Sequence, residues 1–370
     1  MRPLRPHLLT AGALILAAGC SPQKTDDPIA NNRLDESRFF TEAFQLANLT
    51  VWPILAEKLR EIGDFLTLSE AQTRGEAVVK ELGAPVPVPS SALQTNDAVL
   101  NDPGPQVNAV EIENKGDKPI LVCAGTLVKG GRQDRQIAQD IVIAPRTTVP
   151  VDAFCIEERR WVEQRNGTDT KGVFQPLPVL AAKEVRLHAQ YYGDQDGVWR
   201  SVQAYNDAAG KAPETDTLLA AVEEVDAKVK ARREEMEKAI RAHFEALRAR
   251  GKPIVGFAYA INGKPVSVRT FAHPKILDGH LQAFAKTMCI EADLAGSAAG
   301  EAKCPPAKLE DVVKLVQSIQ STPETIQDTK ASNKLGLRRN DAGGNSNCYV
   351  PAPKAEGSLM AVTQDWTSAE

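Results

Sequence analysis

Hydrophobic and polar positions divide the chain into a strand-rich first half and a more helical second half. Apolar residues at 49–52 predict a first strand, after a short helix in 33–47. Residues 110–113 alternate between apolar and polar. A polar turn and a second, apolar strand-like segment over 120–123 follow them, which predicts a β-hairpin. Another strand is expected over 140–144.

The strand that begins at Val149 ends in an unusual local arrangement. Val149, Val151, Ala153, Cys155 and Glu157 lie at intervals of two, so they share one face of the strand. A carboxylate therefore ends an otherwise apolar face, beside a thiol.

The next section is helical. Residues 217–250 hold apolar side chains three, four and seven positions apart, and Gly251 and Pro253 follow them, which predicts one helix of about 30 residues. Arg232 and Arg233 interrupt its apolar stripe. The helix either packs against its own sheet or pairs with a second copy in a coiled coil.

Beyond this helix, 254–260 and 266–271 flank an Asn-Gly turn and predict a hairpin. Helices are expected at about 278–292 and at 309–319.

The end of the chain from Ser321 is rich in Gly, Asn and Pro and is predicted to be loop, with one strand at 358–362. The whole pattern predicts an α+β fold with a β-rich N-terminal half, a long central helix and a second, smaller α/β section. The expected divisions are a leader over 1–19, a stalk and short helix over 20–44, a main domain over 45–295 (β-rich 45–165, helical and hairpin part 166–295), and a C-terminal helix and loop-rich extension over 296–370.

The first twenty residues have the layout of a secretory signal. Basic residues precede a short apolar run over 8–18, and small residues precede Cys20. The small-small-Cys ending resembles the lipobox of bacterial lipoproteins, which implies cleavage after Gly19 and acylation of Cys20. The alternative is an ordinary secretion signal with an incidental cysteine.

Lipidation would make the bilayer a partner of the chain, because buried methylenes contribute about 0.8 kcal/mol each. Ser21 follows the cysteine, and by resemblance to lipoprotein sorting this favours the outer membrane, facing the periplasm. The polar residues up to about Asn32 form a stalk.

Composition narrows the function classes. The formal charge of −4 becomes −6 once the leader, with its two arginines and no acid, is removed. No basic run with interleaved aromatics is present, so no nucleic-acid partner is expected. The sequence has no P-loop, GxSxG, HExxH or dinucleotide motif, and no cofactor is expected.

Five cysteines remain after the anchor, an odd number in an oxidising compartment. Cys289 and Cys304 flank a short Gly/Ala-rich link and form the candidate disulfide. No CxxC and no cysteine near a histidine at ligand spacing is present, so no metal site is expected.

Three stretches resemble one protein family in order and spacing. They are 48–53 continued by 66–71; 124–127 with Gly-Gly-Arg-Gln-Asp-Arg at 130–135; and 149–151 leading to Cys-Ile-Glu-Glu-Arg-Arg-Trp at 155–161. The second is similar to the family's Gly-Gly-x-Gln-x-Arg and the third to its Cys-Val-Glu-x-Gly-Arg-Trp. This family is the domain named for its association with ADP-ribosylglycohydrolases and rhodanese-phosphatase superfamily proteins.

The resemblance extends to the hairpin at 256–271 and the helix after it, and so covers most of the mature chain. Arg159 departs from it, since the family usually has Gly there and a β-carbon restricts positive φ. The family is a domain of unknown function. Its neighbours imply ADP-ribose or nucleotide chemistry by association only.

The second and third stretches supply the candidate site. Gln133 and Arg135 follow two glycines, so the loop is expected to present an amide and a guanidinium on one side, which suits a phosphate or carboxylate. Glu157 is the candidate general base and Arg160 the candidate anion clamp. The alternative for Glu157 is a structural ion pair with Arg135 or Arg160.

Cys155 and Trp161 complete the candidate set. Cys155 is a candidate nucleophile without an identified histidine partner, or else a small buried residue or disulfide partner. Trp161 is either a stacking platform or an aromatic of the core or rim.

Two functions compete on this basis. One is a binding or scaffolding lipoprotein whose Gln/Arg and Cys-x-Glu-x-x-Arg-Trp residues face an anionic small molecule or an envelope protein. The other is a hydrolase or transferase acting on a phosphorylated or ADP-ribose-like molecule, with Glu157 as general acid or base.

Overall fold

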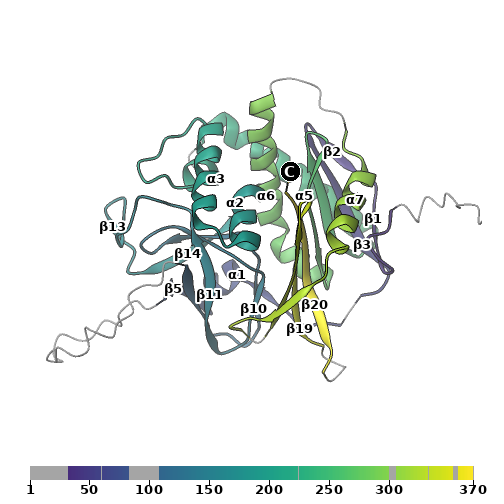
Figure 1. Cartoon of the computed structure of the whole chain (residues 1–370), viewed down its shortest axis with the longest axis horizontal. Helices are drawn as coiled ribbons and strands as arrows, with labels where there is room; N and C mark the ends of the chain where they lie inside the picture. The colour runs from purple at the N-terminus through teal and green to yellow at the C-terminus, as the bar shows by residue number, and fades with distance from the viewer. Residues whose placement is uncertain are drawn as a thin grey trace, which may run out of the picture.

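Two β-sheet systems lie side by side in the computed structural model, with helices between and around them (Figure 1). The structure describes residues 32–59, 61–82, 108–223, 225–299, 306–331, 333–352 and 357–369. The predicted cleavage and lipidation residues Gly19 and Cys20 lie outside these ranges. The predicted α+β class with a β-rich N-terminal half is confirmed.

The first system is a closed barrel with strand order β11-β6-β5-β14-β8-β9. A three-stranded sheet, β10-β7-β4, and the β12-β13 pair accompany it. Apolar side chains fill the space between these sheets, among them Val79, Ile112 and Phe174. The bounds are β4 Leu66–Thr67, β5 Ala77–Glu81, β6 Ala109–Asn114, β7 Ile120–Val122, β8 Thr126–Gly130, β9 Arg135–Ile137, β10 Ile141–Ile143, β11 Thr147–Cys155, β12 Gln164–Arg165, β13 Thr168–Asp169 and β14 Val173–Leu180.

The second system is a large sheet with order β1-β3-β15-β16-β20-β19-β18-β17, in which β2 also pairs with β3. It joins the first and last strands of the chain, because β15 pairs with β3 and β16 pairs with β20. The bounds are β1 Arg38–Phe40, β2 Phe44–Leu46, β3 Leu49–Ala56, β15 Ile254–Ile261, β16 Lys264–Phe271, β17 Thr325–Asp328, β18 Lys334–Asn340, β19 Gly343–Pro351 and β20 Leu359–Ser368.

Helices cover both faces of the large sheet. On one face, α6 packs between β14 and β15 with α5 against it, and on the other face α7 packs on β16 to β20 (Figure 1). None of the helices in the described ranges is long and apolar enough to cross a membrane. The bounds are α1 Leu68–Thr73, α2 Lys183–Leu187, the π-helix η3 His188–Tyr192, α3 Gln195–Ala208, α4 Leu219–Val222, α5 Ala227–Ala249, α6 Pro274–Ala299 and α7 Leu309–Gln320.

Several predicted elements are confirmed. The hairpin of β15 and β16 turns at Asn262 and Gly263, both with positive φ. Helices α6 and α7 form where apolar periodicity placed them, and β3 begins at Leu49. Cys289 is buried in α6, while its expected disulfide partner Cys304 lies outside the described residues, so the disulfide stays a prediction.

The single helix predicted over 217–250 is wrong, because the chain breaks between α4 and α5. Asp226 caps the N-terminus of α5, where its carboxylate accepts hydrogen bonds from the backbone N–H groups of Lys228 and Val229. Met236, Ile240 and Phe244 pack into the core beside the large sheet. The apolar stripe of α5 therefore packs against the chain's own sheet, which is the first of the two alternatives given for this helix, the other being a coiled coil with a second copy.

Two further expectations are wrong. Residues 33–47 form β1 and β2 rather than a helix, since Phe40 packs into the core beside β3. The strands at 110–113 and 120–123 exist but do not pair with each other. The side-chain amide of Asn114 donates to the carbonyls of Lys118 and Ala144, and the chain passes there from the barrel to the neighbouring sheet.

The C-terminal end is not mostly loop, because four strands, β17 to β20, lie beyond Ser321. The sequence concealed β19 since its buried side chains are polar rather than apolar. Asn345, Ser346 and Asn347 are all at most 1 % exposed. This segment lies in the same sheet as β3 and β15.

Candidate functional site

The turn between β8 and β9 depends on two glycines. Gly130 and Gly131 have φ values of 135° and 48°. A Cβ on Gly130 would lie 2.3 Å from the carbonyl oxygen of Val173, and one on Gly131 would lie 2.2 Å from the ring of Phe174. The chain can therefore pass this closely to β14 only with glycine at both positions.

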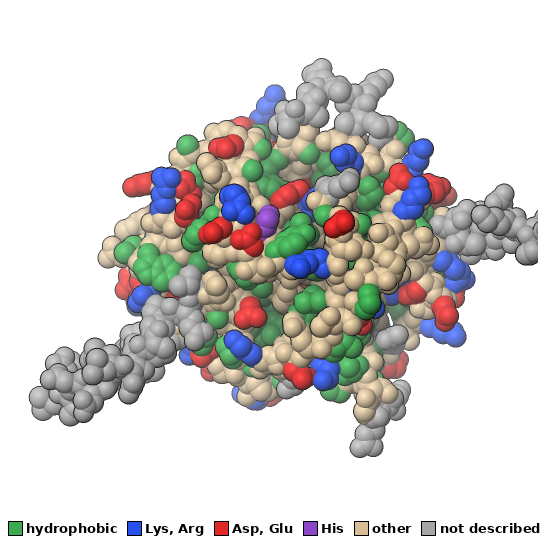
Figure 2. Space-filling view, viewed as in Figure 1, with side chains coloured by type: hydrophobic (Ala, Val, Ile, Leu, Met, Phe, Trp, Pro, Cys, Tyr) green, Lys and Arg blue, Asp and Glu red, His purple; other side chains and the backbone are tan. Residues whose placement is uncertain are grey.

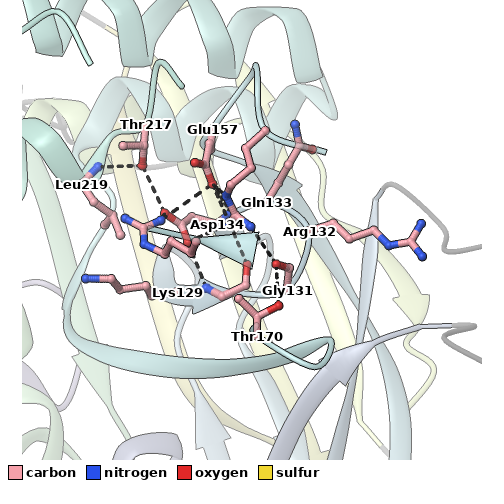
Figure 3. A network of polar contacts seen from close by, with 12 residues as sticks. Lys129, Gly131, Arg132, Gln133, Asp134, Glu157, Thr170, Thr217 and Leu219 are labelled. Atoms are coloured by element: carbon pink, nitrogen blue, oxygen red, sulfur yellow. Dashed lines mark hydrogen bonds and ion pairs between the residues drawn. The ribbon is translucent and has the colours of Figure 1, made fainter. Parts of the chain in front are cut away.

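Two carboxylates and two arginines meet beside this turn (Figure 3). One carboxylate oxygen of Glu157 accepts hydrogen bonds from the backbone N–H of Asp134 and from Nε of Arg160, both at 2.9 Å. Arg165 forms an ion pair with Asp134. Asp134, Glu157 and Arg160 are at most 6 % exposed. We call these four residues the loop cluster.

The side chain of Arg160 also connects two loops by bonding their backbone carbonyls. Its guanidinium donates to the carbonyl oxygens of Gly130 at 3.0 Å, Gly131 at 2.8 Å and Val162 at 2.9 Å. Glu157 thus pairs with one of the two arginines considered from the sequence, and charge-assisted bonds hold both loops in one geometry.

Asp134 is the most enclosed acid of the loop cluster. Its carboxylate accepts hydrogen bonds from the backbone N–H of Gly130 at 2.9 Å and the hydroxyl of Thr217 at 3.2 Å. Burial and the neighbouring charge of Glu157 raise the pKa of Asp134, although Arg165 opposes the shift.

Gln133 and Arg135 do not present their polar groups together to solvent, contrary to the expectation from the sequence. Gln133 is 3 % exposed and donates to the carbonyl of Glu158. Arg135 lies in β9, fully buried, and pairs with Glu81 at 2.9 Å. The sequence did not indicate Glu81, which comes from β5, 54 positions away.

Cys155 ends β11 as a fully buried residue. Its backbone N–H and carbonyl bond the side-chain amide of Gln195 at 2.9 and 2.8 Å. Burial raises the pKa of the Cys155 thiol to about 11. The thiol is therefore protonated at neutral pH, in the form that is a poor nucleophile.

Trp161 and Val162 emerge from the loop cluster into solvent. They are 43 % and 57 % exposed, although they directly follow the buried Arg160. Arg159, the departure from the family motif, is exposed and pairs with Asp216 at 2.6 Å. We call Trp161 and Val162 the apolar tip.

A second set of buried charges was missed from the sequence. Arg269 of β16 forms ion pairs with Asp140 and, at 3.5 Å, with Asp365 of β20, and all three side chains are at most 1 % exposed. Burial by itself would lower the pKa of Arg269, but the two carboxylates raise it above its usual value. We call these three residues the sheet cluster. In the sequence, each residue of the sheet cluster is visible only as an isolated charge in or beside a strand-like segment.

A buried carboxylate on α6 was also missed. Glu291 accepts hydrogen bonds from the backbone N–H of Lys183 at 2.6 Å and from the hydroxyl of Tyr259 at 2.7 Å. Burial and the charge of Glu184 raise the pKa of Glu291 to about 7. Among the described residues, no group of three or more His, Cys, Asp or Glu side chains is arranged to hold a metal ion.

Comparison with known proteins gives one match. The sequence model of a family described as the ARG and Rhodanese-Phosphatase-superfamily-associated Protein domain, ARPP-1, matches residues 39–361. No curated protein and no solved structure matches the chain.

Proposed function

Since the chain belongs to the ARG and Rhodanese-Phosphatase-superfamily-associated Protein domain family, we propose that it is a binding module tethered by lipid in a bacterial envelope. The leader supports the tether through its small residues before Cys20, with cleavage after Gly19. Ser21 supports an outer-membrane location facing the periplasm. The family match covers residues 39–361 and therefore does not include this leader.

One observation carries the binding role. The loop cluster is buried and mutually paired, yet the loop that it fixes exposes the apolar tip, Trp161 and Val162. Tryptophan is enriched among the residues that dominate binding energy, and a fixed loop loses little entropy when a partner docks. We propose that Gln133, Glu157 and Arg160 position this tip, and that an envelope protein binds it.

A protein partner fits this surface better than an anionic small molecule. Two cations of this region are already paired, the half-buried Arg132 with Glu163 and the exposed Arg159 with Asp216. Acidic and basic side chains are also interspersed over the face shown in Figure 2. Among the described residues, these two ion pairs leave less positive charge beside the tip to attract an anion.

No observation favours the hydrolase or transferase alternative at Glu157. A general base must reach the proton that it removes, whereas Glu157 is 1 % exposed and bonded to Arg160. The buried Cys155 thiol, with its raised pKa, supplies no activated nucleophile beside it.

Site-specific photo-crosslinking in the envelope tests the binding role. A photoreactive phenylalanine analogue replaces Trp161 in one full-length variant and Leu59, which is 48 % exposed elsewhere, in a control. We expect a defined protein adduct from position 161 alone. Equal adducts from both positions, or none from 161, would overturn the proposal.

A further inference from the structure

The chain contains the dipeptide Asn-Gly twice, and both copies form the same kind of turn. Asn166-Gly167 joins β12 to β13, and Asn262-Gly263 joins β15 to β16. All four residues have positive φ, at 49° and 76° in the first turn and at 52° and 80° in the second. The two copies therefore differ in their surroundings rather than in their local conformation.

Asn-Gly is a chemically labile sequence. The backbone nitrogen of the glycine attacks Cγ of the asparagine side chain, and no β-carbon on the glycine hinders its approach. Asparagine is accordingly one of the thermolabile residues. Ring closure requires rotation about main-chain and side-chain bonds of the asparagine, which a paired turn restricts, so local opening comes first. The cost of opening and the restraints on the side chain therefore decide which copy reacts.

Asn262 is restrained through both polar atoms of its side chain. Its side-chain oxygen accepts a hydrogen bond from Asn48 at 3.0 Å, and its Nδ2 donates to the carbonyl of Ala295 at 3.5 Å. Its backbone N–H donates to the carbonyl of Asn48 at 2.9 Å. The strands that it joins have eight residues each and lie between β3 and β20 in the large sheet. Opening this turn would break pairing inside the sheet.

Asn166 lacks these restraints. Its side chain is exposed and has no hydrogen bond within the described ranges. A Cβ added to Gly167 would meet no atom within 4 Å, so the space beside the turn is open. Among the described strands, β12 and β13 pair only with each other, over two residues each, at the periphery of the molecule (Figure 1). Isolated two-stranded hairpins are at best marginally stable in water, so this turn opens at little cost.

We propose that Asn166 is a deamidation site of this chain, while Asn262 stays intact in the folded protein. The backbone nitrogen of Gly167 loses its proton and bonds Cγ of Asn166. The bond from Cγ to the side-chain nitrogen breaks, and ammonia leaves. Water then opens the resulting succinimide at one of its two carbonyls, which gives aspartate or isoaspartate. The net reaction exchanges water for ammonia and involves no oxidant or reductant.

The product lies next to the loop cluster. Arg165, which directly precedes Asn166, pairs with Asp134, and the hydroxyl of Thr170 donates to the carbonyl of Glu163 at the base of the hairpin. The new carboxylate competes with Asp134 for Arg165, and isoaspartate adds a methylene to the main chain of the turn. Deamidation should therefore loosen the loop that exposes the apolar tip. The reaction goes beyond the function proposed above, and only its effect on a partner rests on that function.

Peptide mapping by mass spectrometry tests the site. The full-length protein, purified in detergent, is incubated in mildly alkaline buffer, which favours loss of the backbone proton, and both Asn-Gly peptides are followed over time. In the folded chain we expect conversion at Asn166 to be at least about tenfold faster than at Asn262. In denaturant the two rates should come close together, since only the fold distinguishes the copies. Equal rates in the folded chain, or no conversion at Asn166, would overturn the proposal.

Hydrogen exchange tests the effect on the loop. After conversion, the parent should exchange faster over 157–165 than before incubation. Asn166→Gln is the matched control, because its longer side chain closes a larger ring far more slowly, so its exchange should be the same before and after incubation. Unchanged protection of the converted parent would refute the effect on the loop cluster. Neither measurement involves a partner, so this proposal and the crosslinking test of the apolar tip fail independently.

Discussion

The loop cluster and the sheet cluster both bury charges, but they organise different parts of the chain. Asp134 and Arg165 of the loop cluster are 31 positions apart in the sequence. Most hydrogen bonds from the guanidinium of Arg160 go to backbone carbonyls. Asp140 and Arg269 of the sheet cluster are 129 positions apart and bond side chain to side chain. A local cluster fixes the shape of a loop, whereas a long-range cluster joins the two sheet systems.

The two clusters also differ in how many of their arginine N–H groups have a hydrogen-bond partner. Nε of Arg269 has no hydrogen-bond partner within the described ranges. Arg160, by contrast, bonds Glu157 and three carbonyl oxygens. We infer that the sheet cluster depends on charge balance, while the loop cluster depends on geometry.

The largest effect is expected at the centre of the sheet cluster. Arg269→Leu leaves Asp140 buried without its cation and removes one of the two arginines that act on Asp365, which should lower the free energy of unfolding by about 3–5 kcal/mol. Denaturant titration measures this, with the exposed Arg200→Leu as control. A loss as small as that of the control would refute the idea that this arginine joins the two sheet systems.

The next effect concerns Glu291, which differs from both clusters in its raised pKa of about 7. Between its ordinary pKa near 4.5 and about 7, the native carboxyl holds a proton that the unfolded chain releases. The free energy of unfolding should therefore fall as pH rises through this window, by roughly 3 kcal/mol in total.

Glu291→Gln should remove this pH dependence. The variant should melt at a higher temperature than the parent at pH 8 and near the parent's temperature at pH 4, as thermal unfolding across pH would show. Identical pH profiles for the two proteins would mean that Glu291 is not the titrating group.

A smaller effect is expected in the loop cluster. Glu157→Gln keeps an acceptor for the N–H of Asp134 but removes the charge beside Arg160, which should lower the free energy of unfolding by about 2 kcal/mol. The exposed neighbour variant Glu158→Gln is the matched control. A stable Glu157→Gln protein with altered turnover of a substrate would instead restore the acid–base role.

The smallest effect on stability is expected at the apolar tip. Trp161→Ala removes a side chain that is 43 % exposed, so the free energy of unfolding should change by less than about 0.5 kcal/mol. Denaturant titration checks this. A change above about 2 kcal/mol would place the indole in the core rather than at a binding surface.

Local patterns explain what the sequence could predict. The Asn-Gly turn specified the hairpin of β15 and β16, and apolar periodicity specified α6 and α7. Glu157 and Arg160 are three positions apart, so their pairing was among the alternatives readable from the sequence. These features depend on neighbours in the chain.

The remaining features depend on distant contacts. The polar residues of β19 have the composition of a loop. They are buried only because their partners lie in the assembled sheet, where the side-chain amide of Asn345 donates to the backbone carbonyl of Asp365. The pairing of Arg135 with Glu81 and of Arg269 with Asp140 likewise needs the assembled sheets. Periodicity carries no information about such partners.

Hydrogen exchange of the loop over 157–165 tests most directly whether the loop cluster fixes the apolar tip. Compared with the parent, Glu157→Gln should exchange faster in this loop and around Gly130 and Gly131, while Glu158→Gln should not. Equal protection of the loop in both variants would contradict the account, because the tip would then be held by something other than the buried charges.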